Sequence, residues 1–201
     1  SGQIGRYWFE HLAGLPVSVE IASEYRYRHP AHVKGGASLA ISQSGESLDT
    51  LMAMRHASEL GLKSVGIVNV PESTIAREAD LVLPTRAGPE IGVASTKAFT
   101  AQLTVLFSLA IRLGLKRGHL TAAQADIYET ILLGLPGAVG QAIRQFESVR
   151  TVSQYLKRAE SCLFLGRGPL YPLALEAALK LKELSYIHAE GFAAGEMKHG
   201  P

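Results

Sequence analysis

Hydroxyl side chains crowd into one short stretch, SQSGES at residues 42–47, between an apolar run and the start of a helical pattern. The apolar run predicts a parallel strand, and ligands of open α/β sheets bind at the carboxyl ends of such strands. Backbone N–H groups and the helix dipole attract an anion at the following helix start, and Gly45 lets the backbone approach it closely. The turn therefore predicts a cradle for a phosphate monoester. The alternative is that Ser47 simply caps the helix and the other serines fill a tight turn.

A second helix start rich in hydroxyls lies in EIGVASTKAFT, residues 90–100. Ser95 and Thr96 follow another predicted strand, and beyond Thr100 the helix is almost wholly apolar, so its start should be held firmly against the sheet. An ordinary N-cap is the alternative. If both helix starts lie on one edge of the sheet, they can surround one phosphorylated polyol.

Charged side chains form a narrow stripe on the helix predicted for YPLALEAALKLKELSY, residues 171–186. At about 100° per residue, Glu176, Lys180 and Glu183 fall within roughly 60° of one another. Most other positions are Leu or Ala, so we expect a mostly buried helix whose stripe faces a cleft. A lysine between two carboxylates keeps the group charged and can tune one carboxylate as a base. A surface ion pair is the alternative.

His199 is the last candidate for chemistry. It lies in GEMKHGP, where Gly195, Gly200 and Pro201 predict a loop, and a loop histidine can transfer protons near neutral pH. The remaining histidines show no ligand spacing, so we predict no metal. Gly166 and Gly168 supply only half of a dinucleotide fingerprint, so we predict no nicotinamide cofactor and no other cofactor.

Short apolar strands that alternate with helices must position these residues. Strands are predicted at 17–22, 37–42, 63–70, 80–85 and 161–166. Helices are predicted at 1–14, 48–60, 73–79, 95–113 and 171–186, with an all-helical stretch at 121–158 that is broken at GLPGAVG. This alternation favours an α/β fold with a parallel sheet covered on both faces.

Three segments are expected along the chain: a first lobe at 1–117, a helical connector at 118–158 and the beginning of a second lobe at 159–201. ASEYRY at 22–27 and AGEMKH at 194–199 match weakly, as related lobes would. The chain lacks a starting Met and stops at GEMKHGP, so we expect a fragment of a longer protein.

Composition excludes several classes of protein. The 201 residues are 47% hydrophobic and 19% charged with a formal net charge of +2, and no dense basic block favours nucleic acid or a membrane surface. The lone Cys162 excludes a disulfide framework and favours a cytoplasmic protein. The most apolar stretch, AQLTVLFSLAIRLGL, is interrupted by Arg112, so we interpret it as a buried helix.

Several motifs together resemble the sugar isomerase (SIS) family, and within it the isomerase domain of the glutamine–fructose-6-phosphate aminotransferases. The most specific segments are VEIASEYRYR, SQSGES, EIGVASTKAFT, FLGRG, ALKLKE and AAGEMKHGP. A general SIS domain would share the serine turn but not ASTKAFT or EMKHGP. The resemblance implies a three-layer αβα sandwich with two related lobes, the first lacking its first strand and the second only begun.

The resemblance also implies roles for the candidate residues. Phosphate ligands would be Ser42, Gln43, Ser44 and Ser47, the last being Thr in many family members. Val93 and Ser95 would contact sugar hydroxyls. Glu183 would move a proton between C1 and C2, with Lys180 and Glu176 beside it. His199 would open the sugar ring from a neighbouring subunit, which implies a homodimer.

The implied reaction converts fructose 6-phosphate and ammonia released from glutamine to glucosamine 6-phosphate. The glutaminase domain would precede residue 1, and the lysine that forms a Schiff base with the ketose would follow Pro201. We therefore expect the chain alone to lack the full reaction. Two alternatives stay open: a stand-alone SIS isomerase or deaminase of sugar phosphates, and a binding module that senses a sugar phosphate.

Overall fold

The structure is a computed structural model that describes residues 1–32 and 34–200. Val33, between the strands predicted at 17–22 and 37–42, and Pro201, in the motif GEMKHGP, lie outside the described residues. The chain divides into two compact units. The first unit comprises Ser1–Gly2 and Pro16–Phe107, and the second comprises Gln3–Leu15 and Ser108–Pro201.

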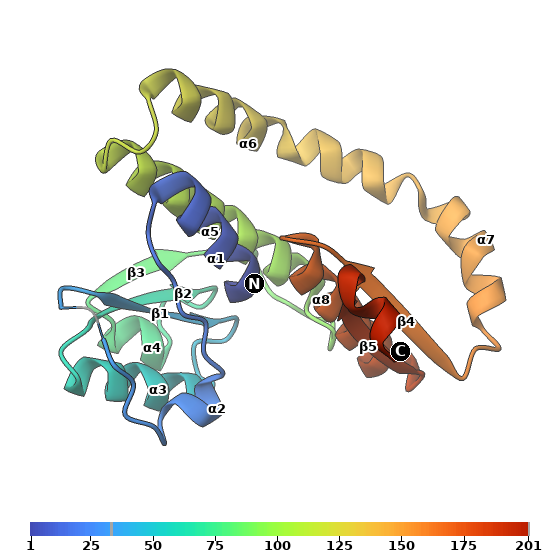
Figure 1. Ribbon diagram of the computed structural model, residues 1–201, viewed down its shortest axis with the longest axis horizontal. Helices are drawn as coiled ribbons and strands as arrows, with labels where there is room; N and C mark the ends of the chain where they lie inside the picture. The colour runs from blue at the N-terminus through green and yellow to red at the C-terminus, as the bar shows by residue number, and fades with distance from the viewer. Residues whose placement is uncertain (33, 201) are drawn as a thin grey trace. The chain divides into compact units, whose positions relative to one another are not determined.

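A parallel three-stranded sheet forms the centre of the first unit. Its strands are β1 (Ala37–Ser42), β2 (Lys63–Val68) and β3 (Leu81–Pro84), in the order β1-β2-β3. Helices α3 (Leu48–Glu59) and α4 (Thr74–Glu78) lie on one face of this sheet (Figure 1). The core beneath them consists of Ala40, Leu51, Met54, Val68 and Ile75. Because the strands are parallel, the loops after β1, β2 and β3 emerge at one edge.

Asp80 ties the opposite, amino edge of this sheet together. Its carboxylate accepts hydrogen bonds from the Ser64 backbone N–H and hydroxyl, each at 2.8 Å, and from Lys63 Nζ at 3.0 Å. The Ser64 backbone bond is the largest of the effects that lower the pKa of Asp80 to about 2. Asp80 therefore stabilises β2 and β3 far from the loops at the carboxyl edge.

The strand predicted at 17–22 is wrong. Residues 17–21 form no ladder, and residues 22–25 form the short helix α2 (Ala22–Tyr25), which packs on α3. A strand is defined by a hydrogen-bonded partner, and in the order β1-β2-β3 the edge strand β1 does not pair with this segment. Ile21 is consequently 71% exposed.

Helix α1 (Gly2–Ala13) confirms the expected opening helix, and its last carbonyls are bonded within the second unit. Arg117 Nε donates to the Ala13 carbonyl at 2.9 Å, and His119 Nε2 lies 3.1 Å from the His11 carbonyl. Gly114 packs directly against the Leu12 backbone, since a Cβ there would lie 2.1 Å from the Leu12 carbonyl oxygen.

Helix α5 (Thr96–Lys116) confirms the helix predicted at 95–113, although it is less buried than expected. Ala98, Leu106, Ala110 and Ile111 are buried, and most of its other residues are half-buried. Among the described residues α5 is the one helix that is long and apolar enough to cross a membrane, and the core helix of a globular domain meets the same criterion.

The all-helical stretch predicted at 121–158 is confirmed, but its break lies elsewhere. Helix α6 (Ala122–Ile143) starts at a capping box formed by Thr121 and Gln124 and runs through GLPGAVG with Pro136 inside it. The helical stretch is interrupted instead at residues 144–145, before α7 (Phe146–Leu156). Pro136 removes one helical hydrogen bond and crowds the carbonyl four residues earlier, and Gly134 and Gly137 flank it, so the local sequence favours a break that the helix does not make.

A second parallel pair lies in the second unit: β4 (Ser161–Gly166) and β5 (His188–Ala193), linked by α8 (Leu170–Ser185). The sequence reasoning missed β5, because HAEGFA is rich in small residues. The small residues are needed, since a Cβ on Gly191 would lie 2.8 Å from Leu175 Cα. Both sheets are parallel, which confirms the α/β fold.

Candidate functional site

The serine turn after β1 is held by its own hydroxyls. Ser42 is 4% exposed, and its Oγ accepts the Gly45 N–H at 3.0 Å and lies 3.0 Å from the Ser47 Oγ. Ser44 Oγ accepts the Glu46 N–H at 3.2 Å. The turn is therefore a preformed ring of hydroxyl and N–H groups at the carboxyl edge of the sheet.

Gly45 is required at the centre of this turn for two reasons. Its φ of 69° is in the left-handed region, and a Cβ would lie 2.0 Å from the Ser73 Oγ. Its carbonyl accepts the Ile75 N–H at 3.0 Å, while the Glu46 carboxylate accepts the Thr74 N–H at 2.7 Å. The bonds to Thr74 lower the pKa of Glu46. The turn is thus bonded to the start of α4.

Ser47 occupies the N-cap position of α3 but makes no side-chain cap hydrogen bond. Ser73 and Thr121, by contrast, accept cap bonds from Ala76 and Gln124 at their own helices. The hydroxyl of Ser47 points to Ser42 instead, so capping does not explain Ser47. The Ser42 and Ser44 hydroxyls accept N–H groups of the turn itself, as the tight-turn alternative expects.

The Asp49 carboxylate, like that of Glu46, opposes anion binding at the start of α3. Asp49 lies in the first turn of the helix. Arg26 NH1 lies 3.5 Å from its carboxylate, and the guanidinium also bonds the Tyr27 hydroxyl, the main cause of the raised pKa of Arg26. Arg26 therefore offsets the charge that Asp49 brings to this helix start.

The loop between β3 and α5 carries Val93 and Ser95 at the same edge of the sheet. Val93 is 90% exposed, and Ser95 has a left-handed φ of 47°. At the start of α5 the Glu90 carboxylate accepts the Ala98 N–H at 3.1 Å, so Glu90 caps this N–H group. The serine turn and this loop belong to the first unit.

The charged stripe on α8 is continuous. Lys180 Nζ lies 2.7 Å from Glu183 Oε2 and 3.5 Å from Glu176 Oε1. Burial lowers the pKa of Lys180, but the hydrogen bond to Glu183 and the two carboxylate charges outweigh it, so the pKa is raised. Lys180 is therefore a cation at neutral pH.

The expectation that α8 is mostly buried is wrong. Its buried residues are Pro172, Ala174 and Ala178, whereas Leu184 is 66% exposed. The Lys180 side chain, at 24%, is more enclosed than this leucine. Only the residues facing β4 and β5 are covered, so the stripe lies beside exposed leucines.

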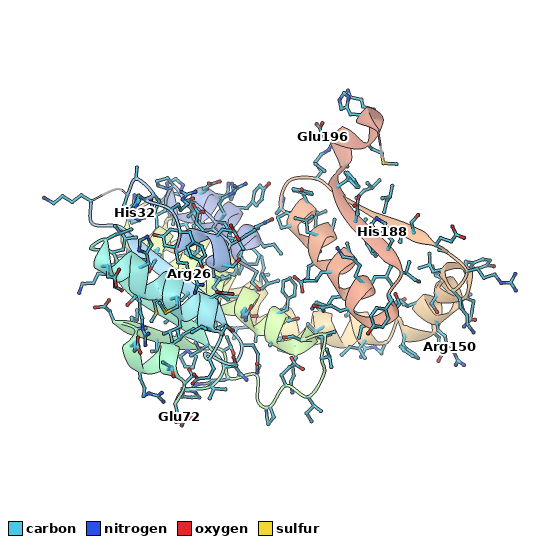
Figure 2. All side chains as sticks on the ribbon, turned by 90° about the horizontal axis from the view of Figure 1, so that it is seen from below. Arg26, His32, Glu72, Arg150, His188 and Glu196 are labelled. Carbon is cyan, nitrogen blue, oxygen red and sulfur yellow. The ribbon has the colours of Figure 1, made fainter. Side chains whose placement is uncertain are left out.

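His199 ends a 3-10 helix, η1 (Ala194–His199), where a loop was expected. Its side chain is 61% exposed, with Nε2 4.0 Å from Glu196. Figure 2 shows Glu196 on the segment that projects beyond β5. Within the described residues no hydrogen bond or ion pair joins His199 to the stripe, although both belong to the second unit.

Asn69 and Glu46 are residues of this site that the sequence reasoning missed. Asn69 follows β2 directly, and its N–H donates to the Gln43 carbonyl at 3.1 Å. Asn69 follows the strand that lies between β1 and β3 in the sequence, and both of those strands lead into candidate loops. This position is a signal that could have identified Asn69.

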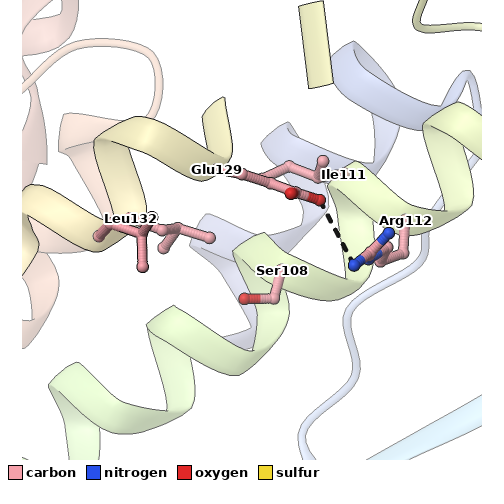
Figure 3. A pocket seen from close by; sticks show the side chains of 6 residues that line it. Ser108, Ile111, Arg112, Glu129 and Leu132 are labelled. Carbon is pink, nitrogen blue, oxygen red and sulfur yellow. Dashed lines mark ion pairs between the residues drawn. The ribbon is translucent and has the colours of Figure 1, made fainter. Parts of the chain in front are cut away.

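A separate pocket of about 310 Å³ lies between α5 and α6 in the second unit (Figure 3). Its lining residues are Ser108, Ile111, Arg112, Glu129, Leu132 and Leu133. Arg112 and Glu129 form an ion pair at 3.6 Å. None of the predicted site residues lines it. No group of three His, Cys, Asp or Glu side chains suited to a metal occurs in the described part of the chain.

Comparison with known proteins adds independent information. The model of the SIS domain family matches residues 1–112 and 155–201. Over 201 residues the chain is 55% identical to the glutamine–fructose-6-phosphate aminotransferase (isomerizing) of Zymomonas mobilis and 53% identical to that of Caulobacter vibrioides. These alignments cover 100% of this chain and 33% of each relative, so the chain spans about a third of their length.

A solved structure shows the same likeness. The C-terminal domain of the glucosamine-fructose-6-phosphate aminotransferase from Francisella tularensis is 45% identical to this chain. The superposition has a TM-score of 0.97 and covers 100% of this chain and 57% of that one.

Proposed function

The chain belongs to the SIS domain family, and we propose that it is the sugar-phosphate-binding and isomerising part of an enzyme that makes glucosamine 6-phosphate from fructose 6-phosphate. The observation that carries this proposal is the serine turn, whose hydroxyls surround a helix start without capping it. The identity to named aminotransferases over the whole chain supports the choice of substrate.

Phosphate binding is assigned to the serine turn. The ligands are Ser42, Gln43, Ser44 and Ser47. A phosphate fits here because hydroxyl and N–H donors converge beside the positive end of the α3 dipole. In the loop after β3, Val93 and Ser95 contact the sugar hydroxyls.

Isomerisation is assigned to the stripe on α8. Glu183 takes the proton from C1 of the open-chain ketose and returns it at C2, as an aldose–ketose exchange requires. Lys180 holds this carboxylate by the 2.7 Å contact, and Glu176 balances the lysine from the other side. The raised pKa of Lys180 makes it a charge partner and not a proton acceptor at neutral pH.

Ring opening is assigned to His199, because an imidazole can take up and release protons in proton-transfer steps. Its side chain is exposed and makes no bond to the stripe of its own chain. We propose that it acts in the site of a second subunit, and hence that the enzyme is a homodimer.

The remaining assignments concern the whole protein. We propose lobe boundaries at 1–117 and 159–201 with the helical connector 118–158 between them. Ammonia from a glutaminase domain and a Schiff-base lysine complete the reaction in the longer protein. The lone cysteine supports a cytoplasmic location.

Titration with fructose 6-phosphate tests the phosphate site. We expect the double variant Ser42→Ala, Ser44→Ala to weaken binding about a hundredfold to ten-thousandfold, because each of the two lost hydrogen bonds to a charged group is worth about 1.5–3 kcal/mol. Isothermal titration calorimetry measures the dissociation constant. Ser153→Ala, on the exposed face of α7, is the matched control. Unchanged affinity in the double variant would contradict this role of the turn.

A further inference from the structure

Asn69 lies between the two loops to which the proposed function assigns the sugar phosphate. It follows β2, the central strand of the sheet, whereas the serine turn follows β1 and the loop with Val93 and Ser95 follows β3. All five of these segments belong to the first unit. Asn69 is half-buried.

The backbone of Asn69 is bonded to the serine turn. Its N–H donates to the Gln43 carbonyl at 3.1 Å, next to Ser42 and Ser44. This bond depends on the position of β2 and not on the side chain at residue 69. A substitution of the side chain alone therefore leaves the serine turn attached.

The side chain of Asn69 is bonded to the other loop. Its Oδ1 accepts the Thr85 hydroxyl at 3.0 Å and the Ala87 N–H at 2.8 Å, and its Nδ2 donates to the Gly88 carbonyl at 2.8 Å. This amide thus uses both its acceptor and its donor on one loop.

These bonds hold a conformation that the loop does not favour by itself. Arg86, between Thr85 and Ala87, has a left-handed φ of 53°. This left-handed backbone conformation is unfavourable for a residue with a Cβ, and it persists only where the surrounding structure holds it. Asn69 receives hydrogen bonds from both neighbours of Arg86, so its side chain fixes this bend and with it the direction in which the loop leaves β3.

We propose that Asn69 is a positioning residue that sets the loop carrying Val93 and Ser95 at a fixed place relative to the serine turn. The inference rests on the proposed function, because it concerns the same ligand. Inorganic phosphate needs the serine turn alone, whereas fructose 6-phosphate needs both loops. The side chain of Asn69 therefore determines affinity for the sugar and not for the phosphate.

The test compares two ligands in the variant Asn69→Ala of the full chain. For fructose 6-phosphate we expect the dissociation constant to rise about tenfold, because the displaced loop loses about one hydrogen bond to the sugar. For inorganic phosphate, followed by phosphorus NMR, we expect less than about a twofold change, because the backbone bond to Gln43 persists. A general loss of structure would weaken both ligands together, so equal losses would overturn the proposal.

Two further variants separate positioning from stability. Thr85→Val removes one of the three side-chain bonds and should raise the dissociation constant for fructose 6-phosphate in the same direction but less. Asp80→Ala removes a comparable set of bonds at the opposite edge of the sheet and should leave the ratio of the two affinities unchanged. A ratio that moves equally in Asp80→Ala would overturn the role of Asn69.

Hydrogen exchange distinguishes failure of this inference from failure of the proposed function. Faster exchange at residues 85–88 in Asn69→Ala, with unchanged affinity for fructose 6-phosphate, would overturn the positioning role and leave the phosphate site standing. No binding of fructose 6-phosphate by the unaltered chain would contradict the proposed function, and the role of Asn69 with it.

Discussion

At the scale of single residues, neighbouring charges decide which groups of the stripe can act as a base. Lys180 contacts both Glu176 and Glu183, and its raised pKa keeps it protonated. Because this pKa is raised in the folded state, the stability from the lysine is present below its usual value of 10.5 and is lost as pH rises through the folded pKa. The cation therefore persists across the physiological range.

Replacing the proposed base should separate binding from chemistry. We expect Glu183→Gln to retain fructose 6-phosphate affinity and to slow isomerisation by about a hundredfold to ten-thousandfold, the usual contribution of a general base. The measurement is the rate of aldose–ketose exchange in a full-length aminotransferase that carries this segment. Glu190→Gln, an exposed carboxylate on β5, is the control. Isomerisation at the unaltered rate would remove Glu183 from the mechanism.

At the scale of elements, glycines mark where backbones approach each other and where they do not. Gly114 of α5 lies against the last turn of α1, with space for no Cβ beside the Leu12 carbonyl. Gly134 of α6 has nothing within 4 Å of the corresponding position. The same substitution should therefore have opposite effects at these two helical positions.

Gly114→Ala and Gly134→Ala test this contrast. We expect Gly114→Ala to reduce the free energy of unfolding by about 1–3 kcal/mol, because the helices must separate to admit the methyl group. Gly134→Ala should increase it by about 0.5–1 kcal/mol through helix propensity. Urea denaturation measures both. A loss of stability at Gly134 as large as that at Gly114 would show that space is not the cause.

At the scale of the whole molecule, one carboxylate links the stability of the first sheet to pH. The pKa of Asp80 is lowered from 3.8 to about 2 by its bonds to Ser64 and Lys63. Because the pKa of Asp80 is lower in the folded state, its carboxylate stabilises the fold at pH values above the unfolded pKa of 3.8. This contribution is lost as the pH falls toward the folded pKa of about 2.

Acid denaturation of Asp80→Asn measures that contribution. We expect the variant to be less stable than the unaltered chain at pH 7 and the difference to shrink as pH falls from about 4 to 2, where the carboxylate is protonated. Unfolding followed by circular dichroism at several pH values gives the two curves. A difference that is constant over this range would assign the effect to packing.

Much of the first unit could be predicted from the sequence. The strand at 37–42 and the helix start at Leu48 were placed at the observed residues, because apolar runs and the serine turn are local signals. The prediction of a strand at 17–22 was wrong, because an apolar pattern is local whereas a strand also needs a neighbouring strand to pair with. The strand β5 was missed for the converse reason, since its pairing with β4 outweighs its weak propensity.

The candidate residues were identifiable by type, whereas their connections were not. The sequence alone determined where the hydroxyl residues, the charged stripe and His199 occur along the chain, because residue types and their helical spacing can be read directly from it. Only the tertiary structure decided that Ser47 turns to Ser42 and not to its own helix, and that Asn69 joins two loops. The reason is physical: the bonds of Asn69 join atoms that are distant along the chain, and only the packing of the parallel strands brings them together. The turn of Ser42 and Ser47 is local, but its backbone is bonded to the start of α4, about 30 residues later.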